Sequence, residues 1–323
     1  MLYQYSQNKM PIHHRHAIKK QQGVAIIAAL FIVALVAAMA YTMMARLERD
    51  TRRTQLILRD TQAEFYAQGS IAWAMDQLYN NWLKQKPTRL IDVTPIKAKD
   101  NEINGYHLAS TIYDMQARYN LNNLVQPEAQ HNFTHLLRAV EPTLTEVKAE
   151  EITSAIADWI SPSSNQSEYS KYYYALSPPY RAAHRAFISV SELHLVKGIT
   201  AKLFTKLQAY VTALPEATAI NVETAEAPVL ATLSPTMTLA AANSIVEARK
   251  GSLFVSPDVF MSLPVVKNNQ VKQANIVTVS TYFLIETIVT IEKQRLVLYT
   301  LVERMTANGK ANLHIVWQSK GLW

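Results

Sequence analysis

Residues 19–46 read KKQQGVAIIAALFIVALVAAMAYTMMAR and decide how the rest of the chain is organised. An uncharged, mostly apolar run begins at Val24 and ends at Met44. As a helix with a rise of about 1.5 Å per residue, the run would be roughly 31 Å long, which matches the hydrocarbon core of a bilayer. It continues into a charged segment without an intervening proline or glycine. We therefore expect residues 24–44 to be the transmembrane part of one long helix.

The charges that precede the apolar run are all positive: Lys9, Arg15, Lys19 and Lys20. Basic residues are retained on the cytoplasmic side of a membrane, so the N-terminus is expected in the cytoplasm and the bulk of the chain outside it. These residues also contribute +4 to the net charge of +7, which leaves only +3 for the remainder. The basic balance therefore gives no reason to expect a nucleic-acid partner.

Three interpretations of the N-terminal segment remain open. It could be a permanent signal anchor, or a secretory signal peptide cut after Ala40, where Ala38 and Ala40 satisfy the small-x-small rule. The third is a type IV prepilin-like signal, in which a basic leader of residues 1–23 is cut on the cytoplasmic side. The abrupt junction between Gly23 and Val24 favours this third interpretation. Against the second, the apolar run exceeds the usual core of a signal peptide, which is about 7–15 residues.

Composition bounds the chemistry that the chain can perform. Its 323 residues can bury a sizeable core, but it has no cysteine and therefore neither disulfides nor thiolate metal ligands. None of its seven glycines forms a phosphate-binding GxxxxGK or GxGxxG loop.

Periodic apolar residues extend the first helix to about Trp82. Leu58, Phe65, Ala72 and Tyr79 recur every seven residues and predict a face that docks on the protein's own sheet. Helical spacing returns further along the chain, in segments 134–140, 144–159, 189–196, 200–214 and 225–263. Alternating patterns predict strands at 89–93, 106–119, 276–291, 296–304 and 313–318.

Turn signals complete the pattern. Asn308 and Gly309 form a strong hairpin signal between the last two predicted strands. The order is a long helix, first strands, a helical block and further strands, which indicates an α+β fold with a helical insertion into an antiparallel sheet.

Several short segments together resemble the general secretion pathway protein K family (GspK), the large minor pseudopilins of type II secretion systems. They occur in the family's order, from GVA at 23–25 to INVETA at 220–225. The segments between these two are RYNLNNL at 118–124, IADWI at 156–160, PPYRAA at 178–183 and SELHLVKGI at 191–199.

The resemblance implies a pilin-like fold, in which a long transmembrane helix packs on an antiparallel sheet that carries a large inserted all-α domain. The implied parts are a leader at 1–23, the transmembrane helix at 24–44, a first pilin-like part at 45–126, an inserted domain at 127–265 and a second pilin-like part at 266–323.

The resemblance also implies a place in the cell and partners. The chain would span the bacterial inner membrane once, with its globular part in the periplasm. It would cap a short pseudopilus with the minor pseudopilins I and J, and would meet the major pseudopilin, the inner-membrane secretion platform and a prepilin peptidase. That peptidase would cut between Gly23 and Val24, and Val24 would become N-methylated. A minor pilin of a type IV pilus is the alternative within the same class.

Ala28 is a departure from the pattern of pilin-like subunits, which usually carry glutamate at the fifth position after the cleavage point. A carboxylate buried among apolar helices is costly unless a cation neutralises it. Its usual partner is the free α-amine of the neighbour nearer the tip. A subunit with nothing above it has no such amine to meet, so Ala28 favours a position at the tip. The alternative is that Ala28 is simply part of the apolar anchor.

Calcium is implied by the family for the loop after the Asp-Trp-Ile motif, but the sequence of this loop puts it in doubt. Calcium prefers six to eight oxygen ligands, many of them carboxylates. The loop at 161–168 reads SPSSNQSE, so only Asp158 and Glu168 remain as charged ligands near it. No other cofactor is expected.

A membrane-anchored DNA receptor is the hypothesis from another class, because residues 220–263 resemble a helix-hairpin-helix segment. That motif needs two glycines so that backbone amides can approach a phosphate. Residues 234–237 read SPTM instead, and proline removes one amide donor. Phosphate binding is therefore not expected there.

A metal or catalytic site is not expected elsewhere either. His131 and His135 have helical spacing, with Glu128 one turn earlier, but no HExxH motif accompanies them. The sequence therefore predicts a protein without enzymatic activity that acts through assembly.

Overall fold

The computed structural model describes residues 22–83, 96–97, 101–162, 167–292, 294–307 and 310–321. The chain divides into two compact units, Met1–Asp60 and Thr61–Trp323. The predicted strand at 89–93 and the turn at Asn308 and Gly309 lie outside the described residues, as does the leader up to residue 21.

Helix α1 (Gln22–Leu83) is continuous and ends close to the predicted residue Trp82. Its residues 61–83 contribute an inward face to the second unit, formed by Ala63, Ala67, Ile71, Ala74 and Leu78. These residues follow one another at steps of three or four, which places them on one side of a helix. Three of the five are alanines, so the helix backbone can approach the sheet closely.

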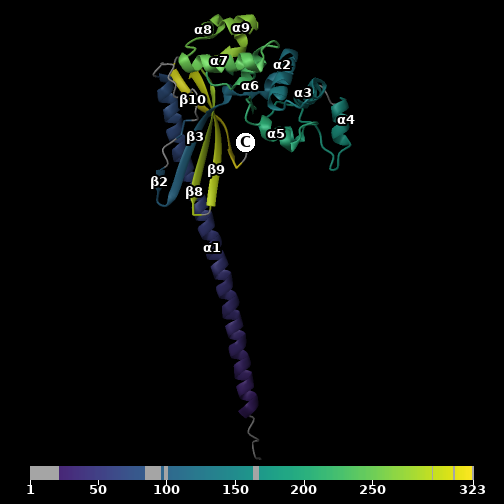
Figure 1. Ribbon diagram of the computed structural model, residues 1–323. Coiled ribbons are helices and arrows are strands. Elements are labelled where there is room, and N and C mark those ends of the chain that lie inside the picture. The colour runs from purple at the N-terminus through teal and green to yellow at the C-terminus, as the bar shows by residue number, and fades with distance from the viewer. Residues whose placement is uncertain are drawn as a thin grey trace, which may run out of the picture. The chain divides into compact units, whose positions relative to one another are not determined.

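The sheet is antiparallel and has the strand order β1-β3-β8-β9-β10, with β2 also paired to β3. Its strands are β1 (Ile96–Lys97), β2 (Asn101–Ile103), β3 (Tyr106–Asp114), β8 (Tyr282–Ile291), β9 (Gln294–Ala307) and β10 (Lys310–Lys320). Strand β3 pairs directly with β8, although more than 160 residues separate them in sequence. The intervening chain therefore leaves the sheet after β3 and returns to it at β8 (Figure 1).

Side chains alternate across the sheet and form two clusters. Phe283 and Ile285 of β8 pack with α1 on one face, together with Leu108 and Ile112 of β3. Tyr282 and Leu284 point to the other face and pack with Met115, Leu214 and Leu301. The first four residues of β8 are consequently all buried, which explains why their sequence reads as a continuous apolar run.

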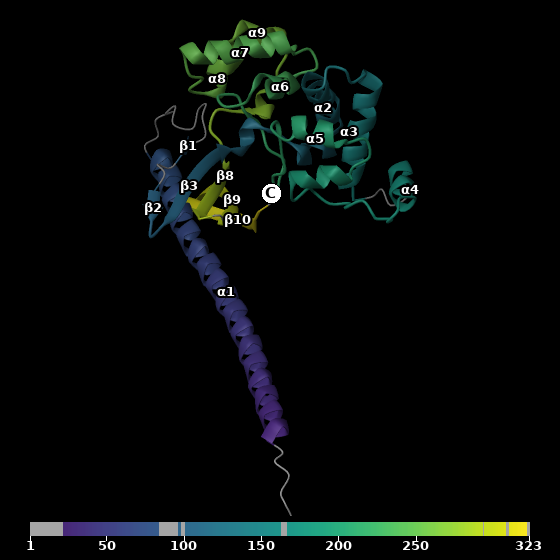
Figure 2. The ribbon, with the colours of Figure 1, turned by 60° about the horizontal axis from the view of Figure 1, so that its bottom comes forward.

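The chain between β3 and β8 is mostly helical and has its own core, centred on Phe133, Leu137, Ile156, Tyr173 and Leu230. Its α-helices are α2 (Pro127–Val140), α3 (Glu146–Ile160), α4 (Glu168–Tyr174), α5 (Ala201–Leu207), α6 (Ala227–Leu230), α7 (Leu239–Gly251), α8 (Pro257–Ser262) and α9 (Pro264–Asn268). Figures 1 and 2 show α2, α3 and α5 in one group and α7, α8 and α9 in another.

Short elements join the helices. The 3-10 helices are η2 (Met115–Ala117), η3 (Leu121–Val125), η4 (Val190–Leu195), η5 (Ala231–Leu233) and η6 (Gln273–Asn275). Two parallel pairs also occur in this part of the chain, β4 (Tyr119–Asn120) with β5 (Val211–Thr212), and β6 (Ile220–Asn221) with β7 (Ile276–Val277). The α+β fold class predicted from the sequence is confirmed, although these pairs mean that the helical part is not purely α.

Several predicted boundaries were wrong for local reasons. The strand expected at 106–119 ends at Asp114, because the Asp114 side chain accepts a hydrogen bond from the Gln116 amide and starts η2. The helix expected at 200–214 ends at Leu207, and Val211 then pairs with Tyr119. The helix expected at 189–196 is present at Val190–Leu195, but it is the 3-10 helix η4 and not an α-helix.

Candidate functional site

The first unit contains a segment with the properties of a membrane anchor. In the described part of the chain, one helix is long and apolar enough to cross a membrane, and its most apolar window has a mean hydropathy of 2.8. Gly23, Val24 and Ala28 are all exposed at its start, and Val24 and Ala28 are one turn apart. Leaving so much apolar surface in water would be costly, so this segment needs lipid or protein around it.

The predicted docking stripe on α1 was wrong. Phe65 is 74% exposed and Leu58 is 57% exposed, whereas Ile71 is 2% exposed. Ala72 and Tyr79 are exposed as well. The sequence pattern followed the largest apolar side chains, but the face that covers the sheet is made mainly of alanines, which carry little signal because alanine suits any helical position.

A groove of about 370 Å³ lies beside Phe65, between α1 and β10 of the second unit. Leu298 and the stem of Lys320 line it together with Phe65, and Lys320 forms an ion pair with Glu64 at its edge. The groove therefore combines an exposed aromatic ring with the outer strand of the sheet.

The asparagine side chains of the RYNLNNL segment, at the start of the helical part, hydrogen-bond to later residues of the same part. The Asn122 side chain accepts from the Phe187 amide at 2.8 Å and donates to the carbonyls of Phe187 and Leu214 at 3.0 and 2.7 Å. Asn120 accepts from the Leu214 amide, and Asn123 exchanges two hydrogen bonds with the backbone of Thr218. Amide side chains suit this task because they donate and accept at once.

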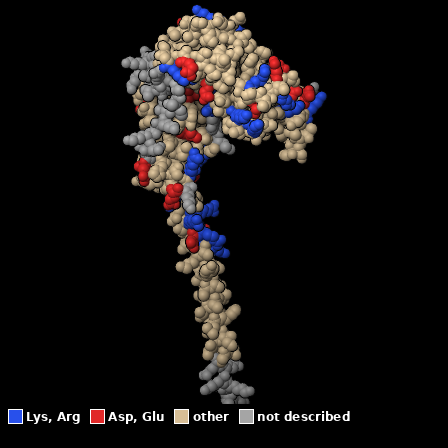
Figure 3. All heavy atoms as spheres, viewed as in Figure 1, with Lys and Arg blue, Asp and Glu red and all other residues tan. Residues whose placement is uncertain are grey.

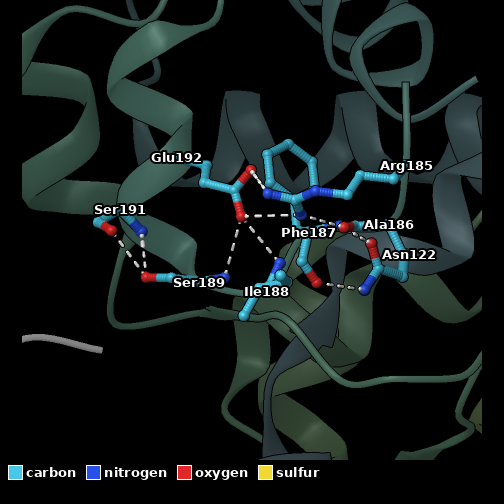
Figure 4. Close-up of polar contacts among 8 residues, drawn as sticks. All are labelled: Asn122, Arg185, Ala186, Phe187, Ile188, Ser189, Ser191 and Glu192. Carbon is cyan, nitrogen blue, oxygen red and sulfur yellow. Dashed lines mark hydrogen bonds and ion pairs between the residues drawn. The ribbon is translucent and has the colours of Figure 1, made fainter. Parts of the chain in front are cut away.

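The SELHLVKGI segment begins with a second polar cluster, which Figure 4 shows beside Asn122. One carboxylate oxygen of Glu192 accepts from the amides of Ile188 and Ser189, and the Ser189 hydroxyl caps η4. Arg185 pairs with Glu192 at 3.4 Å. This capping box fixes the short η4 and holds the loop that presents Phe187 to Asn122.

Asp114 is a junction between the sheet and the helical part that the sequence reasoning did not single out. Its carboxylate accepts from Ser280, Thr224 and Asn221 at 2.7, 2.6 and 2.9 Å, and from the Gln116 amide. Burial raises the pKa of this carboxyl, and the four hydrogen bonds oppose that rise. The available signal was an acidic residue at the end of a predicted strand, four residues before the RYNLNNL segment begins at Arg118.

The INVETA segment is placed by the same junction. Asn221 and Thr224 bind Asp114, while buried Glu223 accepts from the amide of Phe254. Arg249 of α7 donates to the carbonyls of Val222 and Ala225 at 3.1 and 2.6 Å. These polar residues thus fasten α7 and the segment that follows it to the end of the sheet.

The described part of the loop at 161–168 does not fit calcium. Asp158 accepts a hydrogen bond from Ser167, and Glu168 lies in the first turn of α4. Residues 163–166 lie outside the described residues, but their sequence, SSNQ, adds no carboxylate. Two carboxylates fall short of the set that calcium prefers. Within the described residues, no group of three or more histidine and acidic residues is placed to hold a metal.

The other predicted features have structural explanations. Glu128 forms an ion pair with Lys272 at 2.7 Å, while the rings of His131 and His135 lie edge to face, 5.7 Å apart. In the turn at 234–237, the amides of Thr236 and Met237 bond to the side chain and carbonyl of Ser234. These two amides are therefore engaged within the turn, and Met237 packs in the core.

These features define a pilin-like α+β protein with an N-terminal apolar helix and a large, mostly helical insertion. The chain belongs to the type II secretion system protein K family, whose models match residues 117–216 and 220–281. It is a minor pseudopilin of the type II secretion system. The family resemblance seen in the sequence is thereby confirmed.

Relatives and a solved structure agree with this assignment. Type II secretion system protein K of Klebsiella pneumoniae is 31% identical over 79% of this chain and 83% of its own length. The protein of the same description from Pseudomonas aeruginosa is 29% identical over 88% of this chain and 89% of its own. A chain in the crystal structure of the GspK-GspI-GspJ complex from enterotoxigenic Escherichia coli has the same fold, with a TM-score of 0.69 at 22% identity over 83% of this chain and 99% of that one.

Proposed function

We propose that this minor pseudopilin is anchored in the bacterial inner membrane by residues 24–44 and caps the tip of a periplasmic pseudopilus. The observation that carries the tip position is Ala28, the uncharged fifth residue after the proposed cleavage point. If this subunit, with alanine at that position, lay below another, the α-amine of the upper neighbour would have no carboxylate to neutralise it among the apolar helices. A subunit at the top has no such neighbour to neutralise.

The partners proposed for this tip are the minor pseudopilins I and J, because a solved structure of the same fold is part of a complex of proteins K, I and J. The surface that best suits such a partner is the groove beside Phe65. A large aromatic side chain that is 74% exposed next to an outer strand is typical of a protein interface.

Maturation is proposed to occur between Gly23 and Val24, on the cytoplasmic side. Glycine before the cut leaves the backbone accessible to a peptidase. Gly23→Leu should block processing, and mass spectrometry of the wild-type protein should find Val24 at the N-terminus. An N-terminus at Tyr41 would show that a signal peptidase cuts the chain instead.

The tip position is tested by counting copies. Purified pseudopili carrying a labelled version of this protein should contain one copy, at one end of each filament. Copies spread along the shaft would rule out the cap. A pull-down with coexpressed pseudopilins I and J tests the partners separately, and Phe65→Asp should weaken their capture while Glu102→Gln, on exposed β2, should not.

A further inference from the structure

A cluster of arginines follows the apolar part of α1 immediately. Arg46, Arg49, Arg52 and Arg53 occur within eight residues, and none of the basic residues between positions 46 and 59 is a lysine. Figure 3 shows basic side chains gathering on α1 where its uncharged stretch ends. Arginine binds phosphate with a planar fork of donors, which the ammonium group of lysine cannot reproduce.

Three of these arginines share one face of the helix. At about 100° per residue, Arg46, Arg49 and Arg53 lie within roughly 60° of one another. By the same reckoning Glu48 lies on the far side of the helix, whereas Asp50 borders this face, about 40° from Arg46 and 60° from Arg53. All three arginines are exposed, and the structure gives their guanidinium groups no carboxylate partner among the described residues. The Nε atom of Arg49 donates to the carbonyl of Ala45 at 3.0 Å, so two of its guanidinium nitrogens are not used in this bond.

The distance of this face from the apolar run matches the thickness of a headgroup layer. Arg46 and Arg49 begin about 2 and 6 Å beyond Ala45 along the helix axis, and Arg53 about 12 Å beyond it. The polar layer of each leaflet is about 5–8 Å thick, and long basic side chains reach back toward it. We infer that Arg46, Arg49 and Arg53 form a collar that binds the phosphates of anionic lipid headgroups and so fixes the depth of α1 in the bilayer.

The occupant is a membrane surface because the collar begins where an uncharged helix long enough to span a bilayer ends. It rests on α1 being a membrane anchor, as proposed above. Phosphatidylglycerol provides the matching chemistry, since it carries a phosphate and a net negative charge. Zwitterionic phosphatidylcholine carries the same phosphate next to a cation, so it should bind more weakly.

The test uses the full chain reconstituted into phosphatidylcholine vesicles that contain traces of spin-labelled lipid. Electron spin resonance then measures how strongly spin-labelled phosphatidylglycerol associates with the protein relative to spin-labelled phosphatidylcholine. The wild-type protein should prefer phosphatidylglycerol, and Arg46→Gln with Arg49→Gln should lower this preference by on the order of fivefold for each arginine removed.

A matched control removes the same charge from the same helix. Arg52 and Arg59 lie off the collar face, and Arg59 begins about 21 Å beyond Ala45. The double variant Arg52→Gln with Arg59→Gln should therefore retain most of the preference for phosphatidylglycerol. An equal loss of this preference in the two double variants would overturn the collar, because it would show only a diffuse effect of charge. Inorganic phosphate should lower the preference for phosphatidylglycerol no more than sodium chloride of the same ionic strength does. A larger decrease with phosphate would identify free phosphate as the ligand and overturn the inference.

Flotation of the vesicles separates this inference from the anchor itself. Protein that does not float with the vesicles after alkaline washing would refute the anchor, and the collar with it. Protein that floats but shows no preference for phosphatidylglycerol would refute the collar alone.

Discussion

The guanidinium group of Arg304 donates a hydrogen bond to the main-chain carbonyl of Leu78 at 3.2 Å, which joins strand β9 to the last turns of α1. The same group lies over the ring of Phe283, 4.4 Å from its centroid. Arg304 is buried, and burial lowers its pKa to about 10, so it remains charged at neutral pH. Arg304 thus helps to hold the end of the long helix on the sheet.

Arg304→Ala should therefore destabilise the protein by about 2–4 kcal/mol, through loss of a hydrogen bond from a charged donor and of a cation–π contact. Thermal unfolding of the full chain in detergent, followed by circular dichroism, measures the change. Arg295→Ala on the same strand removes an equal charge from an exposed site and should shift the melting temperature little. Equal effects of the two substitutions would show that Arg304 contributes only its charge.

Substitutions on opposite faces of α1 should separate folding from assembly. Ile71→Ala should cost about 2–4 kcal/mol, because Ile71 is 2% exposed and packs against the sheet. Phe65→Ala should change the stability by no more than about 0.5 kcal/mol, because its ring is mostly in solvent. Thermal melts provide this comparison. A large loss of stability in Phe65→Ala would restore the original assignment of Phe65 to the sheet-facing side.

Asn122→Asp should destabilise the helical part more than its small change in shape suggests. The asparagine amide donates to the carbonyls of Phe187 and Leu214, and a carboxylate would face both oxygens without a donor. Placing an unpaired charge at this buried position should cost at least about 3 kcal/mol. Asn312→Asp, on the exposed side of β10, is the matched control. Chemical denaturation that found equal midpoints for the two variants would contradict the clamp.

Glu141 should make the free energy of unfolding depend on pH in the acidic range. A hydrogen bond from Lys206 at 2.8 Å, with a second from Thr143, lowers the pKa of this carboxyl from 4.5 to about 2. Because the folded pKa lies below the unfolded value, the stabilisation is present above pH 4.5 and is lost as the pH falls toward 2. Lys206→Met should reduce the loss of stability over this pH range, as measured by denaturation at several pH values. An unchanged pH profile would show that the pair does not contribute.

The apolar run and the order of elements were determined by the sequence alone. Twenty-one consecutive uncharged residues have few alternatives to a membrane-spanning helix, and the change from helical to alternating periodicity after residue 275 marked strands β8–β10. Colinear short segments were enough to indicate the family, because their order is more specific than any one of them. Cleavage at Gly23 and the role of Ala28 remain predictions.

Only the tertiary structure decided which face of α1 covers the sheet and what the polar segments do. Alanine fits both a buried and an exposed helical position, so Ala63, Ala67 and Ala74 gave no sign of burial, while exposed Phe65 gave a false one. Asp114 and Asn221 are more than 100 residues apart, yet they meet because β3 ends where the chain returns toward β8. Periodicity describes one element at a time, whereas a buried hydrogen bond depends on which distant segments the fold brings together.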